Sequence, residues 1–263
     1  MPDFTDQTGR IISINYFPKR IISLVPSQTE LLFHLDMEHE VAGITKFCIH
    51  PPEWHLHKIK VGGTKNLNIE LIHSLSPDLI IANKEENTKE QIEILQKNYP
   101  VWVSDVNNII SSCEMIEQIG EIVDKKEKSQ QLSLKIKEGF NSLTLNKIIS
   151  KTVYLIWQNP YMTVGSDTFI HSILEIAGFE NVFKYKNRYP EISITDIQDA
   201  NVELLLLSSE PYPFKEKHIS ALQKQLPDTK VLLVNGEMFS WYGSRLLLVP
   251  EYLQKLKNQI PAL

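Results

Sequence analysis

Three histidines, His50, His55 and His57, lie close together in the segment KFCIHPPEWHLHK. Imidazole nitrogens are frequent metal ligands, and the His-x-His pair could chelate an ion. A strong site needs a third and a fourth ligand at suitable spacing, which this segment does not supply. We therefore expect solvated or loop-packed histidines here, and no metal site. His34 and His171 lie beside apolar residues of predicted helices, where a hydrogen-bonded role in the core or at its boundary is the default.

Sequence motifs of familiar catalytic sites are absent. The chain contains no phosphate-binding loop motif, no G-x-G-x-x-G, no G-x-S-x-G and no H-E-x-x-H. Cys48 and Cys113 form no C-x-x-C motif, and an unpaired cysteine is commonly a small core residue. We therefore expect two buried free thiols rather than a disulfide, and we predict no catalytic residue and no cofactor.

Aromatic side chains collect in segments that follow apolar runs. The two main segments are Trp157–Met162 (WQNPYM) and Met238–Arg245 (MFSWYGSR), and Tyr189–Pro190 and Glu210–Phe214 lie in similar places. Aromatic and polar side chains at the carboxyl ends of strands are what a ligand crevice in an α/β fold requires. The same residues could instead pack the loops, so both interpretations stay open on the residues alone.

Length and composition allow one large domain or two small ones. The chain has 263 residues, of which 42% are hydrophobic and 22% are charged, as in ordinary globular proteins. Its 27 basic and 32 acidic residues give a formal net charge of −5. Such a surface does not attract phosphate backbones in general, so we expect no nucleic-acid partner. No window approaches the about eighteen consecutive apolar residues of a membrane span, so we expect none.

Short apolar runs alternate along the chain with segments of helical periodicity. The predicted strands are 20–25, 41–45, 78–82, 101–104, 152–157, 202–207 and 230–234. The predicted helices are 29–35, 69–76, 88–98, one from about 109, 169–177 ended by Gly178, 216–225, and 245–259 interrupted by Pro250. Unbroken apolar strands indicate burial on both faces of a parallel sheet, so the pattern predicts an α/β fold.

Three strands of the first half correspond to three of the second half at nearly constant spacing. The offsets are 132, 125 and 130 residues, for the pairs Ile21 and Val153, Leu79 and Leu204, and Val101 and Val231. Near-constant offsets predict two similar lobes. One continuous doubly wound sheet remains the alternative.

The segment between the halves has the character of a helical bridge. Residues 111–147 contain no proline, and their apolar positions recur mostly every three or four residues, which predicts one long helix or two abutting helices. A rigid bridge of this kind would let the lobes move little against each other. The predicted organisation is an N-terminal α/β lobe at 1–110, the bridge at 111–147 and a C-terminal α/β lobe at 148–263.

The order of several motifs resembles a known family. These motifs are RIISLVPSQTELLFHL, VAGIT, VGGTKNLNIELIHSLSPDLIIANKEEN, YMTVGSDTFIHSILEIAGFENVF and RYPEISITDI. Together they resemble the substrate-binding proteins of ABC importers for cobalamin and iron–siderophores, the class III periplasmic binding proteins or helical-backbone metal receptors. The resemblance covers about residues 20–255. It implies two Rossmann-like α/β lobes joined by a long rigid helix, with a ligand in the cleft between them and no catalysis.

The resemblance also implies residues for ligand binding. Cleft-lining aromatic positions of the cobalamin branch fall on Phe47, Thr64, Asn83 and Tyr189, of which only Phe47 and Tyr189 are aromatic here. A carboxylate near the C-terminal part of the cleft falls on Glu237. Arg245 would neutralise an anionic ligand group or pair with Glu237. With the aromatic segments above, the expected ligand-binding residues are Phe47, Trp157, Tyr189, Glu237, Trp241, Tyr242 and Arg245.

Family members dock on their permease through one surface carboxylate from each lobe. The first carboxylate falls on Glu70 in LNIELI. The second falls at Thr195, with Asp196 beside it, so Asp196 is the candidate in that lobe.

We therefore expect a non-catalytic, monomeric binding protein for a metal–tetrapyrrole such as a corrinoid, or for a ferric–siderophore chelate, that serves an ABC permease. The resemblance implies a periplasmic location. The N-terminal stretch MPDFTDQTGRIISINYFPKR lacks the pattern of a secretory signal, so a cytoplasmic location stays open. Two alternatives follow: a tetrapyrrole-metal chelatase-like enzyme that uses His50 or His171 with Glu237, and an intracellular corrinoid carrier or sensor.

Overall fold

The structure is a computed structural model of the chain, and it describes residues 1–14, 17–143 and 150–260. The chain forms two compact units. Unit 1 comprises Met1–Val106, Ile110–Glu138 and Trp241–Leu247, and unit 2 comprises Asn107–Ile109, Gly139–Ser240 and Leu248–Leu263. The boundaries after residues 110 and 147 remain predictions, and position 147 lies outside the described residues.

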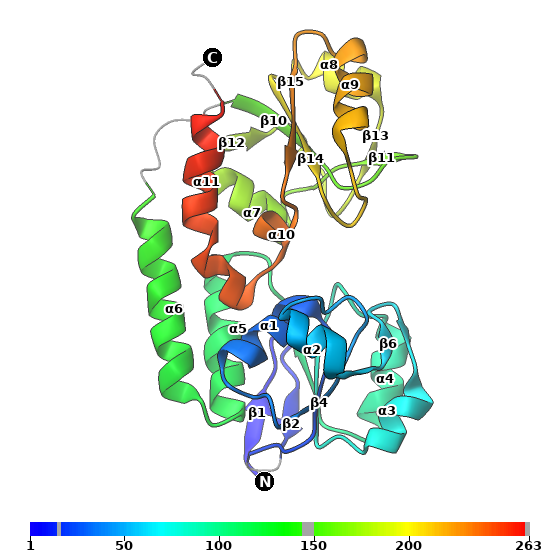
Figure 1. Cartoon of the computed structure of the whole chain (residues 1–263), viewed down its shortest axis with the longest axis vertical. Helices are drawn as coiled ribbons and strands as arrows, with labels where there is room; N and C mark the ends of the chain where they lie inside the picture. The colour runs from blue at the N-terminus through cyan, green and yellow to red at the C-terminus, as the bar shows by residue number, and fades with distance from the viewer. Residues whose placement is uncertain (15–16, 144–149, 261–263) are drawn as a thin grey trace. The chain divides into compact units, whose positions relative to one another are not determined.

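Unit 1 is built on a five-stranded parallel sheet. Its strands follow the order β5 (Ile59–Lys60), β4 (Val41–Ile44), β3 (Ile21–Ser23), β8 (Leu79–Asn83) and β9 (Val101–Ser104). Figure 1 labels β4 among them. Every residue of β3, β8 and β9 is buried. Burial on both faces is the condition that favours unbroken apolar strands, and it explains why these strands are recognisable in the sequence.

Four helices and one hairpin lie between the strands of this sheet in the chain. The helices are α1 (Pro26–His34), α2 (Pro52–His57), α3 (Ile69–Leu75) and α4 (Lys89–Gln96), and the hairpin consists of β6 (Gly62–Gly63) and β7 (Asn66–Leu67). α1 starts earlier than the periodicity predicts because Pro26 occupies its first turn, where the missing N–H has no helical partner to lose. α3 starts as predicted, since the Asn68 side chain accepts a hydrogen bond from the Leu71 N–H.

The predicted bridge consists of two helices, α5 (Ile109–Ile122) and α6 (Lys126–Asn141), so the alternative of two abutting helices is confirmed. Asp124, between them, has φ 58°, a left-handed conformation that does not continue a right-handed helix. The helices meet closely where Gly120 faces Ser129, since a Cβ at position 120 would overlap the Ser129 side chain. Residues 144–147 of the predicted bridge lie outside the described residues.

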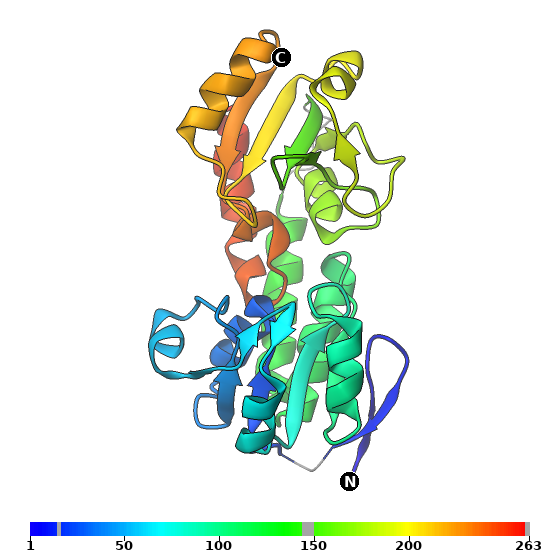
Figure 2. The same ribbon diagram turned by 90° about the vertical axis from the view of Figure 1, so that its right-hand side faces the viewer.

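Unit 2 has a separate parallel sheet, with the strand order β12 (Phe179–Asn181), β10 (Ser150–Leu155), β14 (Leu204–Ser208) and β15 (Lys230–Val234) (Figure 2). A separate two-stranded antiparallel sheet of β11 (Tyr161–Met162) and β13 (Glu191–Ile192) accompanies it. Its helices are α7 (Phe169–Ile176), α8 (Ile194–Asp199), α9 (Glu216–Gln225), α10 (Glu237–Ser240) and α11 (Val249–Asn258). Gly178, with φ 78°, follows the end of α7, as predicted.

The two sheets share one strand order. In unit 1, β3 lies between β4 and β8, and β9 follows β8; in unit 2, β10 lies between β12 and β14, and β15 follows β14. These are the strands that the sequence offsets paired, β3 with β10, β8 with β14 and β9 with β15. The prediction of two similar α/β lobes is therefore confirmed, and the alternative of one continuous sheet is wrong.

The predicted last helix, 245–259, is wrong in its first part. Gly243–Leu247 forms a 3₁₀ helix, and α11 begins only at Val249. Pro250 does not interrupt α11, because it lies in the first turn, where its ring and missing N–H are tolerated.

The sequence pattern does not predict the N-terminal hairpin of β1 (Asp3–Thr5) and β2 (Ile11–Ser13). Its tip is fixed to unit 1 by Gln7, whose N–H donates to the Val103 carbonyl at 3.2 Å and whose Nε2 donates to the Ser111 carbonyl at 2.8 Å. Asp6 is 3% exposed, and its carboxylate accepts hydrogen bonds from Thr8 and Arg10. The hairpin is thus held by contacts distant in sequence.

Cys48 and Cys113 are both buried and free, which confirms the expectation of two unpaired thiols. Among the residues that the structure describes, no helix combines the length and the apolar character needed to cross a membrane.

Candidate functional site

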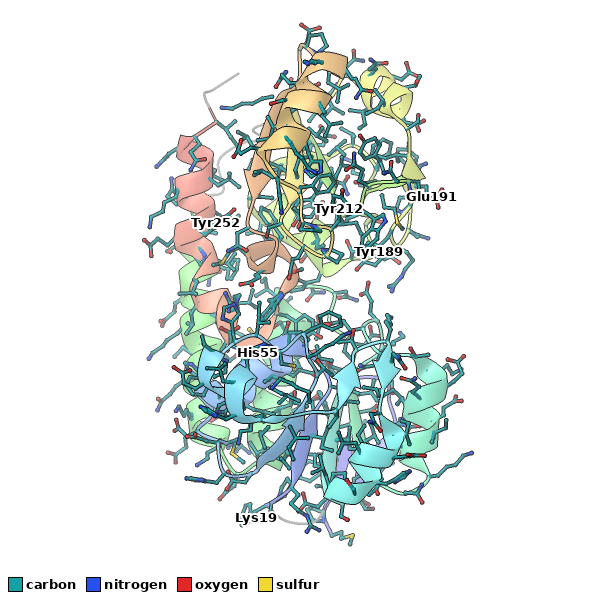
Figure 3. All side chains as sticks on the ribbon, turned by 45° about the vertical axis from the view of Figure 1, so that its right-hand side comes forward. Lys19, His55, Tyr189, Glu191, Tyr212 and Tyr252 are labelled. Carbon is teal, nitrogen blue, oxygen red and sulfur yellow. The ribbon has the colours of Figure 1, made fainter. Side chains whose placement is uncertain are left out.

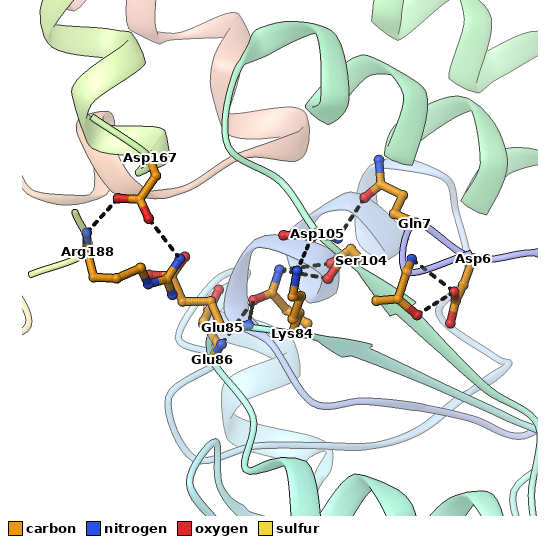
Figure 4. Close-up of polar contacts among 11 residues, drawn as sticks. Asp6, Gln7, Lys84, Glu85, Glu86, Ser104, Asp105, Asp167 and Arg188 are labelled. Carbon is orange, nitrogen blue, oxygen red and sulfur yellow. Dashed lines mark hydrogen bonds and ion pairs between the residues drawn. The ribbon is translucent and has the colours of Figure 1, made fainter. Parts of the chain in front are cut away.

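Polar and aromatic residues follow the carboxyl ends of the unit 1 strands. Phe47 comes after β4, the segment Lys84–Asn87 comes after β8, and Asp105 comes after β9. In open parallel sheets this edge is where ligands bind, which makes these segments the candidate binding edge of unit 1. Figure 4 shows how Lys84 pairs with Asp105, and how Gln7 of the N-terminal hairpin accepts a hydrogen bond from the Asp105 N–H at 3.0 Å.

Phe47 presents an exposed ring on a firmly anchored turn. Its side chain is 51% exposed, whereas the next residue, Cys48, is completely buried. The Cys48 sulfur accepts a hydrogen bond from Thr29 Oγ1 at 3.1 Å and lies 3.2 Å from Thr45 Oγ1. Burial raises the pKa of the Cys48 thiol, so the residue acts as a neutral anchor and not as a reactive thiolate. The ring beside it is therefore held in place while remaining open to a partner.

Asn83 has a different role from the aromatic residue that the resemblance places at this position. It is 3% exposed, and its Oδ1 accepts hydrogen bonds from the N–H groups of Glu85 at 2.8 Å and Glu86 at 2.9 Å. Its Nδ2 donates to Ser104 Oγ at 3.0 Å. Asn83 thus shapes the turn after β8. Thr64, the other non-aromatic position, uses its carbonyl to accept a hydrogen bond from Asn87 Nδ2 at 3.0 Å.

Tyr242 is buried in unit 1. Its hydroxyl donates to Glu86 Oε1 at 2.9 Å, and the side chain is 4% exposed. Burial raises the pKa of Tyr242 well above its ordinary value, and the neighbouring Glu86 charge acts in the same direction. The neutral phenol therefore fixes the direction of the Glu86 carboxylate.

Trp241 and Arg245 lie together in the same segment. Arg245 Nε and Nη2 donate to the two Glu30 carboxylate oxygens at 2.9 and 2.7 Å, which is a bidentate pair. The Arg245 guanidinium lies 4.8 Å from the centre of the Trp241 ring, and the His50 ring meets Trp241 edge to face at 5.3 Å. Within unit 1, Glu30 is thus a carboxylate partner of Arg245, and the expected pairing of Arg245 with Glu237 stays a prediction.

Aromatic residues of two predicted segments meet in unit 2. Trp157, 40% exposed, follows β10, and its ring centre lies 5.6 Å from that of Tyr212. The Tyr212 hydroxyl donates to Gln158 Oε1 at 2.9 Å, and its ring packs against Phe214 at 4.8 Å. Tyr212 was not among the expected ligand-binding residues, although the Glu210–Phe214 segment carried the signal for it. Figure 3 labels Tyr212 and Tyr189 within this unit.

Tyr189 lies in the loop before β13 and is partly buried. The Arg188 guanidinium lies 5.8 Å from the centre of the Tyr189 ring, and the Arg188 N–H donates to the Asp167 carboxylate (Figure 4). Glu237 is the first residue of α10, and its N–H donates to Asn235 Oδ1 at 3.0 Å. The bond of the Arg188 N–H thus fixes the backbone next to Tyr189, and the bond of the Glu237 N–H fixes the start of α10.

The two candidate docking carboxylates lie at the starts of short helices. Glu70 is exposed in the first turn of α3. Asp196 is exposed in the first turn of α8, where its Oδ2 accepts hydrogen bonds from Ser193 N and Oγ, both at 2.7 Å. These bonds lower the pKa of Asp196, so its carboxylate is ionised and caps its own helix. Thr195 holds the position in α8 that Glu70 holds in α3, the second residue of the helix.

Among the residues that the structure describes, no three His, Cys, Asp or Glu side chains gather as ligands of one metal ion. His55 and His57 lie in helix α2 and not in the expected loop, and His55 Nδ1 lies 3.1 Å from the Cys48 carbonyl oxygen. His171 is buried and its Nδ1 lies 3.2 Å from Asn181 Nδ2, so its expected hydrogen-bonded role is confirmed. Burial lowers the pKa of His171 and favours the neutral ring.

Comparison with known proteins adds to this geometry. The family model described as periplasmic binding protein matches residues 21–232. An uncharacterized ABC transporter substrate-binding lipoprotein of Bacillus subtilis, YvrC, is 30% identical over 187 residues, which are 67% of this chain and 59% of that protein. The alignment thus spans less than two thirds of that relative's own length.

Two of the similar proteins are named after the ligand that they bind. The vitamin B12-binding protein of Salmonella typhi is 24% identical over 251 residues, 93% of this chain and 92% of that protein. The crystal structure of the periplasmic vitamin B12-binding protein BtuF of Vibrio cholerae superposes with a TM-score of 0.77 at 21% identity, covering 92% of this chain and 99% of that one. This structural likeness establishes the shared fold.

Proposed function

Because the chain belongs to the periplasmic binding protein family, we propose that it binds a metal–tetrapyrrole of the corrinoid type and delivers it to an ABC importer. Proteins of this family bind their substrates without converting them, so the chain is a substrate-binding protein and not an enzyme. A ferric–siderophore chelate is the second ligand class. The chelatase-like alternative, with His50 or His171 and Glu237, has no support among the relatives.

The observation that carries the ligand class is the pair of exposed aromatic rings at strand ends. Phe47 in unit 1 and Trp157 in unit 2 are 51% and 40% exposed, although each lies on a segment held by hydrogen bonds or ring contacts. A rigid, accessible aromatic ring binds the flat face of a macrocycle with little loss of side-chain entropy. The near full-length similarity to a vitamin B12-binding protein supports the corrinoid among such macrocycles.

The candidate ligand residues divide into two roles under this proposal. Phe47, Trp157, Tyr189 and Glu237 contact the ligand, the aromatic residues through their faces and Glu237 through a hydrogen bond. Trp241, Tyr242 and Arg245 are 6%, 4% and 6% exposed, and they act by holding Glu86, Glu30 and the strand ends in position.

Isothermal titration calorimetry tests the ligand. We expect cyanocobalamin or cobinamide to bind with a Kd of about 1 μM or tighter, because burying the macrocycle against aromatic rings offsets the cost of association. Haemin and a ferric hydroxamate siderophore serve as the competing ligands. Tight binding of haemin or the siderophore, without binding of either corrinoid, would reassign the ligand class. If none of the four compounds binds, the proposal is wrong.

The permease is the proposed partner, with Glu70 and Asp196 as the docking carboxylates and the chain acting as a monomer. The Glu70→Ala variant is expected to lower substrate-stimulated ATP hydrolysis by the reconstituted importer about tenfold, since it removes an exposed charge that steers and orients association. Corrinoid affinity should not change. Glu90→Ala, which removes an exposed carboxylate from the first turn of α4, is the matched control. Equal losses in both variants would argue against docking through Glu70.

Export is part of the proposal, since delivery to an importer takes place outside the cytoplasm. Cell fractionation with an antibody against the chain distinguishes this location from that of an intracellular corrinoid carrier or sensor. Recovery in the cytoplasmic fraction alone would favour the carrier.

A further inference from the structure

The Gly62–Gly63 strand β6 lies next to the turn that carries Phe47. The Lys46 N–H donates to the Gly62 carbonyl at 2.8 Å, which ties this turn to β6. β6 in turn pairs with β7, with Gly62 opposite Leu67 and Gly63 opposite Asn66. The backbone beneath Phe47 is therefore fixed through two hydrogen-bonded connections.

The two glycines have different physical reasons to be glycine. Gly62 has φ +107°, and a Cβ there would come within 2.5 Å of the Asn66 carbonyl oxygen, so its own backbone excludes other residues. Gly63 is not among the residues with positive φ, and its backbone would accept alanine. What a Cβ at position 63 would meet is the side chain of Phe47.

A Cβ at Gly63 would lie 3.1 Å from Phe47 Cε2 and 3.3 Å from Lys46 Cε. Both distances are shorter than the about 3.5–4.0 Å of an ordinary carbon–carbon contact, so both side chains would have to move outward. Gly63 thus provides the space in which the Phe47 ring lies against the backbone. The Lys46 Nζ, 5.1 Å from the ring centre, adds a cation–π contact.

The Phe47 ring therefore has a packed side and an open side. Gly63 and the Lys46 stem define the packed side, and half of the side chain remains exposed. Because buried Cys48 anchors the next residue, a shift at position 63 acts on the orientation of the ring more than on the course of the backbone.

We propose that Gly63 is a positioning residue, which sets the orientation of the Phe47 ring and so determines how a flat conjugated ligand is received. The effect on ligand binding rests on the proposed function, in which Phe47 contacts the macrocycle. The effect of Gly63 on the orientation of the Phe47 ring does not depend on the proposed function. A side chain at position 63 tilts the ring and reduces the flat area that it offers.

The test uses the full chain with 4-fluorophenylalanine at position 47, read by fluorine NMR, and cobinamide affinity measured on the unlabelled variants. The variants are Gly63→Ala and Gly63→Val. The control is Asn66→Ala, which changes an exposed residue on the opposite strand of the same hairpin. Circular dichroism checks that each variant folds. If Gly63→Val does not fold, the test is made with Gly63→Ala alone.

We expect the fluorine signal to shift in the glycine variants and not in Asn66→Ala. Cobinamide affinity should fall about threefold in Gly63→Ala and about tenfold in Gly63→Val, within the range of a misplaced aromatic contact. In the Phe47→Ala background, the Gly63 variants should cause no further loss. An unchanged fluorine signal, or an undiminished loss of affinity without Phe47, would overturn the positioning role. If the fluorine signal shifts but Phe47→Ala does not change cobinamide affinity, Gly63 still positions the ring. In that case Phe47 is not a ligand contact, and the proposed function loses this residue.

Discussion

Replacing Arg245 with alanine is expected to lower the free energy of unfolding by about 3 kcal/mol, the low end for breaking a buried ion pair. The Arg245 side chain is 7% exposed and the Glu30 side chain is 19% exposed, so Glu30 would keep its charge in a largely dry position without a partner. The variant also removes the cation that lies 4.8 Å from the centre of the Trp241 ring. Urea unfolding, followed by circular dichroism, measures the loss.

An exposed ion pair provides the control for Arg245→Ala. In the Lys89–Glu93 pair the side chains are 83% and 56% exposed and the charges are 3.8 Å apart, so Lys89→Ala should cost only about 0.3 kcal/mol. The double variant Glu30→Leu with Arg245→Met should recover much of the stability, because it removes both charges of this pair together. An equal cost for Arg245→Ala and Lys89→Ala would show that the Arg245 pair is no more than a surface contact.

Replacing Gly120 with alanine is expected to cost about 3 kcal/mol, at the upper end of overpacking effects. The added Cβ would overlap Ser129 Cβ and Oγ on the facing helix and would come 3.2 Å from the Lys125 carbonyl oxygen. Both α5 and α6 would have to move to relieve the overlap. Thermal unfolding in the same buffer as the parent protein gives the change.

Exchanging the small residue between the helices tests this mechanism. Ser129→Gly together with Gly120→Ala returns the space that the new methyl group needs, so we expect the double variant to recover at least half of the lost stability. The glycine in helix α6 itself costs about 1 kcal/mol. A double variant as unstable as the sum of the two single variants would show that the contact between positions 120 and 129 does not cause the loss.

The sequence predicts best those elements whose signal in the sequence is local. β9 (Val101–Ser104), α9 (Glu216–Gln225) and β15 (Lys230–Val234) have the predicted boundaries, because unbroken apolar runs and a 3.6-residue period identify them without knowledge of their neighbours. The likeness of the two lobes could be predicted as well, because the same runs occur twice, whereas the order of the strands in each sheet comes from the structure alone.

The N-terminal hairpin shows why other elements are missed. β1 and β2 are three residues long and depend on hydrogen bonds that Gln7 makes to partners 98 and 104 residues away. Such bonds leave no periodic signal in the sequence around them. The 3₁₀ helix at Gly243–Leu247 is missed for a similar reason, since Gly243 N–H donates to Ser112 Oγ, 131 residues away.

At the candidate site, the residue types pointed to the right segments of the chain, but they did not show what each side chain does there. The aromatic composition identified the segments that contain Trp157 and Tyr242, and the family resemblance identified Phe47, but the partners of the buried residues lie far along the chain. Tyr242 bonds to Glu86 at a separation of 156 residues, and Arg245 bonds to Glu30 at 215. Only the folded chain shows that Asn83 shapes a turn and that Glu30 faces Arg245.

The inclusion of Trp241–Leu247 in unit 1 has a consequence for biosynthesis. Unit 1 opens the chain, yet its core includes Leu246, completely buried, and the Arg245–Glu30 pair, which reach the ribosome's exit only after most of unit 2 has been made. At a synthesis rate of about 5–20 residues per second, these residues follow the rest of unit 1 by several seconds. Until then, their contacts with α1 and α5 are not formed. Unit 1 is therefore the first unit to begin synthesis, but it can complete its folding only after most of unit 2 has been synthesised.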